Sequence, residues 1–69
     1  MTTTEVETIV RAVVVHYGLP FTVVTVSPSS NAWDIAFRDS SGGIVSLAVR
    51  ATTPGALRIA VQEQLEAQM

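Results

Sequence analysis

The sequence of 69 residues contains no cysteine and no lysine. The lack of cysteine excludes disulfide bonds and zinc sites built on thiolates. All four cationic side chains are arginines, against six acidic residues, and the formal net charge is −2. Nucleic-acid-binding proteins draw much of their affinity from phosphates neutralised by cationic side chains, so this composition disfavours a nucleic-acid partner.

The sequence also lacks long apolar runs and a basic N-terminal region. The longest apolar run, residues 12–15, is far shorter than the about 20 residues that a membrane-spanning helix requires. The first eight residues hold no basic side chain and do not resemble a signal peptide, so we expect a cytoplasmic protein with no membrane contact. Yet 48% of the residues are apolar and only 14% are charged. For one domain spanning residues 1–69, this surplus favours burial of surface by a partner.

Two segments have the apolar spacing of amphipathic helices. The first can begin with either of two Thr-x-x-Glu capping boxes, starting at Thr2 or at Thr4, and Gly18 is suited to end it. In the second, Thr53 is suited to be the N-cap and Pro54 the first helical residue. The apolar positions of the two predicted helices are Val6, Ile9, Val10, Val13 and Tyr17, and Leu57, Ala60, Val61 and Leu65.

Three segments between the helices, residues 21–27, 31–39 and 44–50, are rich in β-branched and aromatic side chains and are predicted strands. Pro28 is expected in the first turn, and the glycines of SSGG in the second. If Arg38 faces Ile44 across the second turn, every apolar residue of one face meets an apolar residue. The predicted fold is α+β in the order α-β-β-β-α, a three-stranded antiparallel meander with both helices on one face. The apolar pairs are Trp33–Val49, Ile35–Leu47 and Phe37–Val45.

The opposite face of this predicted sheet has no helix to cover it. Strict alternation would add two large apolar residues from the first strand, either Phe21 with Val23 or Val24 with Val26, and the sequence does not decide between them. Small side chains elsewhere make the face suited to close approach by another chain, although antiparallel sheets often leave one face solvated. The predicted interface consists of Phe21, Val23, Asp34, Ala36, Arg38, Ile44, Ala48 and Arg50.

No residue pattern predicts catalysis, a metal site or a cofactor. The one histidine, His16, falls at the end of the first helix, where an imidazole can interact with the last carbonyl groups. No nucleophile or carboxylate near it in the sequence completes a catalytic site. Gly42 and Gly43 lie in a predicted hairpin and not between a strand and a helix, so they do not form a phosphate-binding loop.

The order of elements resembles the double-stranded RNA-binding-domain fold, and over the whole length the chain resembles a reduced member of the HicA (YcfA-like) toxin family. The similarity rests on Gly18 and on the segment TTPGALRIAV, residues 52–61. The family's active form carries Gly-Ser-His at the start of the second strand, where this chain has Ser30, Asn31 and Ala32. The resemblance therefore implies the fold without the activity.

The sequence leads to a first hypothesis of a small, non-enzymatic protein-interaction module. It is expected to be a homodimer formed through the open sheet face or an edge strand, with Asp34 and Arg38 setting the register. The alternative is a degenerate nucleic-acid-binding domain that uses Arg38, Arg50 and Arg58. A third hypothesis, an enzyme or toxin built around His16, has least support because no second catalytic group is evident.

Overall fold

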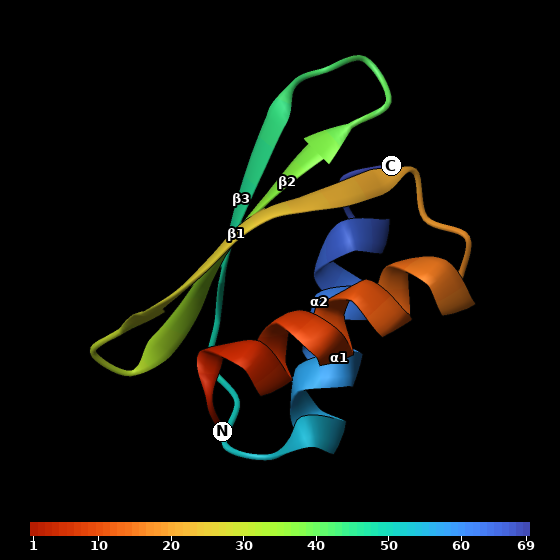
Figure 1. The fold of residues 1–69 in the computed structure, drawn as a ribbon. Coiled ribbons are helices and arrows are strands. Elements are labelled where there is room, and N and C mark those ends of the chain that lie inside the picture. The colour runs from red at the N-terminus through yellow and green to blue at the C-terminus, as the bar shows by residue number, and fades with distance from the viewer.

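The computed structural model describes residues 1–69 as two helices and three strands (Figure 1). The predicted order α-β-β-β-α is confirmed, and the strands form one antiparallel sheet in the order β1-β2-β3. This topology is compatible with a double-stranded RNA-binding-domain-like fold. Neither helix has the length and apolarity needed to cross a membrane. The elements are α1 (Thr3–His16), β1 (Phe21–Ser29), β2 (Ala32–Asp39), β3 (Ile44–Val49) and α2 (Pro54–Glu66).

Both helices begin at threonine caps. Of the two possible capping boxes at the start of α1, the structure uses the earlier one, in which the Thr2 hydroxyl oxygen accepts a hydrogen bond from the Glu5 backbone N–H at 3.2 Å. At the start of α2, the Thr53 oxygen accepts from the Ala56 N–H, also at 3.2 Å. Because unpaired N–H groups at a helix start are costly, these side chains fix where each helix begins.

The end of α1 is set by Gly18, which has a φ of +61°. This left-handed conformation costs glycine little, and it turns the chain so that the Leu19 N–H donates to the Val14 carbonyl at 3.0 Å. Leu19 then enters the core and Phe21 opens the first strand. The prediction that Gly18 ends the first helix is therefore confirmed.

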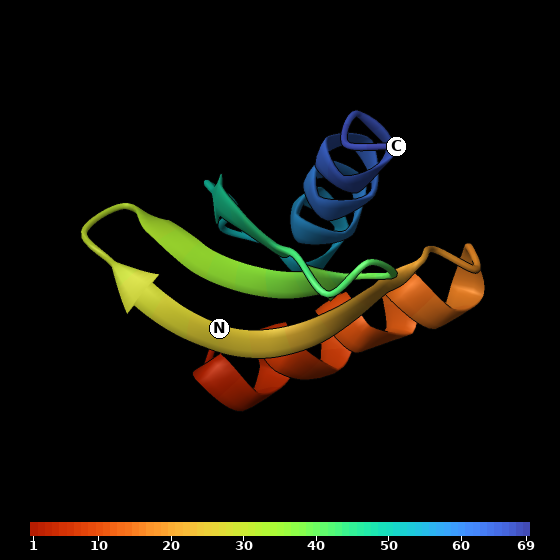
Figure 2. The same ribbon diagram turned by 90° about the horizontal axis from the view of Figure 1, so that it is seen from above.

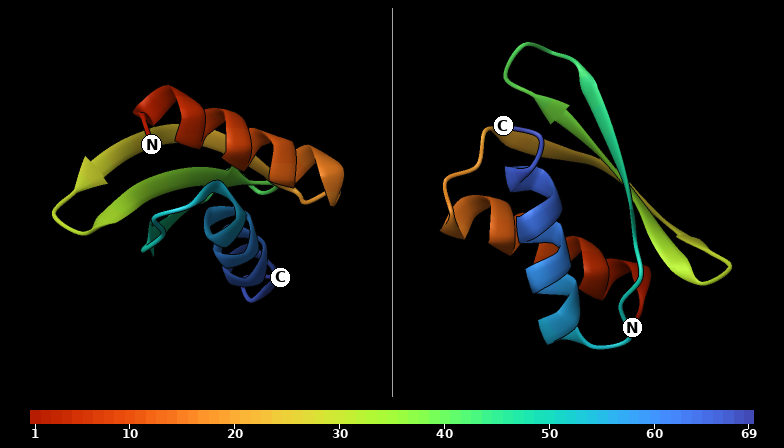
Figure 3. Two further views of the ribbon diagram at one scale, coloured as in Figure 1. Left: turned by 90° about the horizontal axis from the view of Figure 1, so that it is seen from below. Right: turned by 180° about the vertical axis from the view of Figure 1, so that it is seen from behind.

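The core lies between the sheet and the two helices. The predicted pairing of β2 with β3 is confirmed at every position, from Trp33 opposite Val49 to Arg38 opposite Ile44. Figures 2 and 3 show α1 running along β1, while α2 crosses α1 and packs beside β3. Tyr17 belonged to the predicted apolar stripe but is 48% exposed, because α1 has ended at His16. The buried core consists of Val6, Val10, Val13, Leu19, Phe21, Ile35, Phe37, Leu47, Val49, Leu57, Val61 and Leu65.

Strand β1 contains a bulge at Val24, and this bulge overturns the strict alternation assumed from the sequence. Val23 pairs with Phe37 and Thr25 pairs with Ala36, so Val24 has no partner on β2. The extra residue shifts the alternation by one, and Val26 lies opposite Ile35 on the core side. Apolar residues from both halves of β1 therefore point at the helices, which neither regular register would allow.

Strand β1 is also longer than predicted, because Pro28 lies within it and not in the turn. Pro28 pairs with Trp33, and only Ser30 and Asn31 separate β1 from β2. Proline lacks an N–H and is tolerated in a sheet only on an edge strand or at a bulge. Since β1 is an edge strand, the N–H missing from Pro28 need not cost a ladder bond.

The loop between β2 and β3 is held by one carboxylate. Asp39 Oδ1 accepts hydrogen bonds from the Ser41 hydroxyl at 2.8 Å, the Ser41 N–H at 3.0 Å and the Gly43 N–H at 2.8 Å. These bonds lower the pKa of Asp39 below its ordinary value of 3.8, and the bond from the Ser41 hydroxyl makes the largest contribution to that shift. Gly42 supplies the positive φ of +89° that the turn requires.

Deletion of Val24 tests the role of the bulge. Without Val24, strict alternation keeps Phe21, Val23 and Val26 on the core face, so we expect the folded state to survive with little loss of stability. Deletion of Thr22 is the matched control, because it moves Phe21 to the solvent face and should cost about 2 kcal/mol. Urea unfolding of both variants measures the difference. Equal destabilisation by the two deletions would contradict the claim that the bulge decides which residues of β1 face the core.

The Asp39 carboxylate predicts a contribution to stability that depends on pH. Its pKa is lower in the folded chain than in the unfolded chain, so the contribution is present above about pH 4 and disappears as the pH falls through the folded value. Asp39→Asn should lower the melting temperature near neutral pH, and the two melting curves should converge in acid. Thermal unfolding from about pH 7 to pH 2 measures this. A constant difference across that range would contradict the prediction.

Candidate interaction surface

The sheet face turned away from the helices is uncovered. Its residues form three rows across the strands, as the pairing register shows: Thr22, Arg38 and Ile44; Thr25, Ala36 and Ser46; Ser27, Asp34 and Ala48. We call these nine residues the open face. All are exposed except Ala36 at the centre, which is half-buried. The predicted lack of intramolecular cover is therefore confirmed.

Two residues expected on this face do not belong to it. Phe21 is 8% exposed and lies edge-on to Phe37 with the ring centroids 6.2 Å apart, and Val23 packs against the same core. Their placement on the open face was wrong because the bulge lets β1 direct both of them inward. Thr22 and Thr25 take the outward positions instead, and the unpaired Val24 is 45% exposed. The open face is consequently more polar than expected, and Ile44 is its largest apolar side chain.

The open face carries one charge of each sign. Asp34 and Arg38 lie on β2, two residues before and two residues after Ala36. Neither takes part in an ion pair within the chain, where the one salt bridge joins Arg11 to Glu7 on α1 at 2.8 Å. Both charges are therefore available to groups outside this chain. Arg50, which was also predicted for the interface, is exposed just beyond the end of β3.

The centre of the open face is a shallow hollow of about 360 Å³. Three of the residues around it, Ala36, Ser46 and Ala48, have small side chains. A larger side chain from another surface can therefore approach the sheet backbone. The residues that line the hollow are Thr25, Asp34, Ile35, Ala36, Ser46, Leu47 and Ala48.

The two edges of the sheet are less suited to pairing with another strand. The bulge at Val24 interrupts β1 in the middle, and Pro28 removes an N–H group near its end. Strand β3 has only six residues. Bulges, proline and short strands are the features by which proteins prevent edge-to-edge association. The edges of the sheet therefore carry three features that oppose pairing with another strand.

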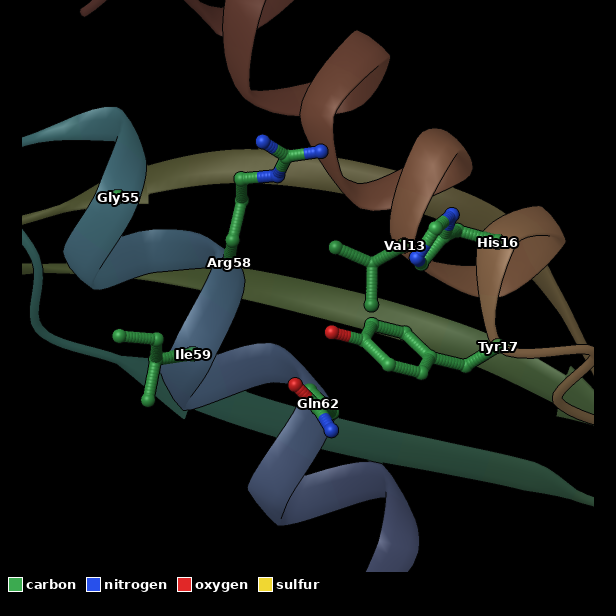
Figure 4. A pocket seen from close by; sticks show the side chains of 7 residues that line it. All are labelled: Val13, His16, Tyr17, Gly55, Arg58, Ile59 and Gln62. Carbon is green, nitrogen blue, oxygen red and sulfur yellow. The ribbon is translucent and has the colours of Figure 1, made fainter.

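A second hollow, of about 390 Å³, lies between the end of α1 and the first turns of α2 (Figure 4). His16 lies here, with its ring edge-on to Tyr17 at a centroid distance of 4.8 Å. No acidic residue lines this cleft, and no group of three or more His, Asp or Glu side chains in the chain could hold a metal ion. We call it the helix cleft, and it is lined by Val13, His16, Tyr17, Gly55, Arg58, Ile59 and Gln62.

The arginines of the alternative hypothesis do not share one surface. Arg38 lies on the open face and Arg50 follows β3, whereas Arg58 lines the helix cleft. Neither the threonines of the open face nor the cleft itself was predicted from the sequence. The spacing of Phe21, Val23 and Val26 was the available signal for the former, since steps of two and then three residues are typical of a bulged strand.

Comparison with known proteins adds no identification. No protein-family model matches the chain, and neither a curated protein nor a solved structure shows a significant match.

Proposed function

We propose that the protein is a small, non-enzymatic interaction module that forms a homodimer through the open face. The observation that carries this proposal is the arrangement of opposite charges about Ala36. Most soluble homo-oligomers have two-fold symmetry, in which residue i of one subunit meets residue j of the other, and j meets i. Asp34 and Arg38 lie at equal steps from Ala36, so the open face is complementary in charge to itself.

Consider two sheets stacked face to face, with a two-fold axis midway between them that runs perpendicular to β2 and passes over Ala36. This axis places each end of one β2 strand over the opposite end of the other. It places Asp34 of each subunit opposite Arg38 of the other. An axis parallel to β2 would instead bring like charges together, which is unfavourable. The charges therefore support association, and they favour the arrangement in which the two β2 strands run antiparallel.

The same axis gives a steric fit. Ile44 shares a row with Arg38, and Ala48 shares a row with Asp34. The exchange of ends therefore places Ile44 of each subunit over Ala48 of the other. Ile44 is 58% exposed in the isolated chain and can fill space beside the small alanine. A large side chain packed against a small one is the usual means by which facing layers interdigitate.

The size of the open face limits the strength of this dimer. A patch of roughly 500 Å² per subunit lies below the about 800 Å² that each partner buries in a standard interface. If the whole patch were apolar, its gross hydrophobic contribution would be about 12 kcal/mol per subunit at 25 cal/mol per Å², and association and ordering costs of comparable size oppose it. The threonines and serines on the face reduce it further. We therefore expect reversible association with a dissociation constant on the order of 10 to 100 μM.

Two finer expectations from the sequence belong to this proposal. One is the cytoplasmic location. The other is a distant relationship to the HicA family, supported by the order of elements and by the helix start at Thr53 and Pro54. The nucleic-acid alternative has less support, because the arginines are divided between two sides of the molecule and the net charge is −2.

Ala36→Glu should prevent dimerisation, because the covered face would bury a carboxylate that has no partner. The matched control is Ala12→Glu, the same change at an exposed position of α1. Sedimentation equilibrium should show a molecular mass that rises with concentration for the wild type and the control, and a monomer for Ala36→Glu. A wild type that is monomeric at about 500 μM, well above the expected dissociation constant, would reject the proposed dimer.

Charge exchange tests the orientation of the two subunits. Asp34→Arg and Arg38→Asp should each weaken the dimer, because each places like charges opposite one another. The variant with both changes should recover dimerisation, since it recreates two opposite-charge pairs with the roles reversed. Sedimentation of all three variants at one ionic strength gives the comparison. If the double variant dissociates as readily as the single ones, the two β2 strands do not meet in this way.

The alternative function predicts nucleic-acid binding with a steep dependence on salt. On the proposed function, double-stranded RNA or DNA should bind no more tightly than the non-specific range of roughly 10⁻⁴ to 10⁻⁶ M at physiological salt. Fluorescence anisotropy of a labelled duplex measures the affinity. Nanomolar binding that Arg38→Gln or Arg50→Gln abolishes would instead support the degenerate nucleic-acid-binding domain.

A further inference from the structure

We propose that the helix cleft binds a small ligand that carries an oxyanion, a phosphate or a carboxylate, on an apolar body. Hydrogen-bond donors from two helices, which the sequence separates by about forty residues, line the cleft. Its volume of about 390 Å³ lies within the range of about 300 to 1,000 Å³ that is typical of small-molecule sites.

The polar side of the helix cleft consists mainly of donors. Figure 4 shows the Tyr17 hydroxyl directed from α1 towards α2, and the Arg58 side chain extending from α2 towards α1. Arg58 has no salt bridge, and neither its guanidinium group nor the Tyr17 hydroxyl makes a hydrogen bond within the chain. A guanidinium group can bind a carboxylate or phosphate through two parallel hydrogen bonds.

The electrostatic surroundings favour an anion. None of the six acidic residues lines the helix cleft, although the chain as a whole is acidic. One lining donor is already bonded to a carboxylate, since the Gln62 amide donates a 3.5 Å hydrogen bond to Glu66. Three carbonyls near the end of α1 are engaged, since Val13, Val14 and Val15 accept bonds from the N–H groups of Tyr17, Leu19 and Gly18, respectively. The carbonyls of His16 and Tyr17 accept none of these bonds, so the end of α1 opposes an anion and the guanidinium group of Arg58 must outweigh it.

The remaining lining specifies an apolar body for the ligand. The exposed apolar surface comes from Ile59, 59% exposed, and the ring of Tyr17, 48% exposed, whereas Val13 at 1% exposure offers a ligand little surface. Gly55 has open space where a side chain would begin, which leaves one side of the cleft unobstructed. A bare inorganic anion would contact only the donors. A phosphate or carboxylate on an aromatic or aliphatic group would use both halves of the cleft.

The helix cleft is formed by the two helices, whereas the open face is the side of the sheet that they leave uncovered. A ligand in the cleft therefore need not disturb the proposed dimer, and the inference does not depend on it. Binding can be measured on Ala36→Glu as well as on the wild type. Equal affinity of the two proteins is expected.

NMR titration with phenyl phosphate, benzoate and benzyl alcohol at constant ionic strength tests the proposal. We expect at least one of the two anions to shift the resonances of His16, Tyr17 and Arg58 saturably, with a dissociation constant on the order of 1 mM. Binding of phenyl phosphate alone would identify phosphate esters, and binding of benzoate alone would identify carboxylates. Inorganic phosphate should bind more weakly than phenyl phosphate.

Arg58→Gln should weaken binding about tenfold, as expected for loss of a charge-assisted hydrogen bond. Arg50→Gln removes the same charge outside the cleft and should leave the affinity unchanged. Both positions are exposed, and the amide spectra of the variants establish that each is folded. The proposal is overturned if neither anion gives saturable shifts up to about 20 mM, if benzyl alcohol binds equally well, or if both arginine variants behave alike.

Discussion

The structure depends on the burial of one face of β2. This central strand contributes Ile35 and Phe37, at 1% and 0% exposure, to the core that lies between α1 on β1 and α2 beside β3. Two short helices can cover only one side of a three-stranded sheet, so burial of these residues leaves the other side of the same strand exposed. The core and the proposed interface are therefore two faces of one segment. A shift of β2 by one residue would lose both at once.

The bulge at Val24 links these two faces. By directing Phe21, Val23 and Val26 towards the helices, it enlarges the core of a chain too short to bury much surface. The cost is an unpaired residue and a locally disrupted strand. The benefit on the other side is a sheet face with small and polar groups, which favours reversible association over the permanent kind that large apolar patches produce.

Most of the fold could be predicted from the sequence because its signals are local. Thr53 followed by Pro54, Gly18 followed by Pro20, and the glycines before Ile44 each specify a cap or turn within a few residues. The register of β2 with β3 followed from apolar pairing alone. The bulge was not predicted, because either regular register of β1 buries two apolar residues, and the step from Val23 to Val26 becomes a signal only when the core requires a third. The helix cleft depends on how α1 crosses α2, which no local pattern encodes.

The contact between α1 and α2 has a consequence for how the molecule folds. These are the first and last of the five elements, so they meet only after the intervening strands have brought distant segments together. A three-stranded meander forms from neighbouring segments, but it keeps Leu47 and Val49 exposed until residues 54–66 arrive. Completion of the core therefore requires the contact of greatest sequence separation, and contacts that close long loops are the ones that slow folding.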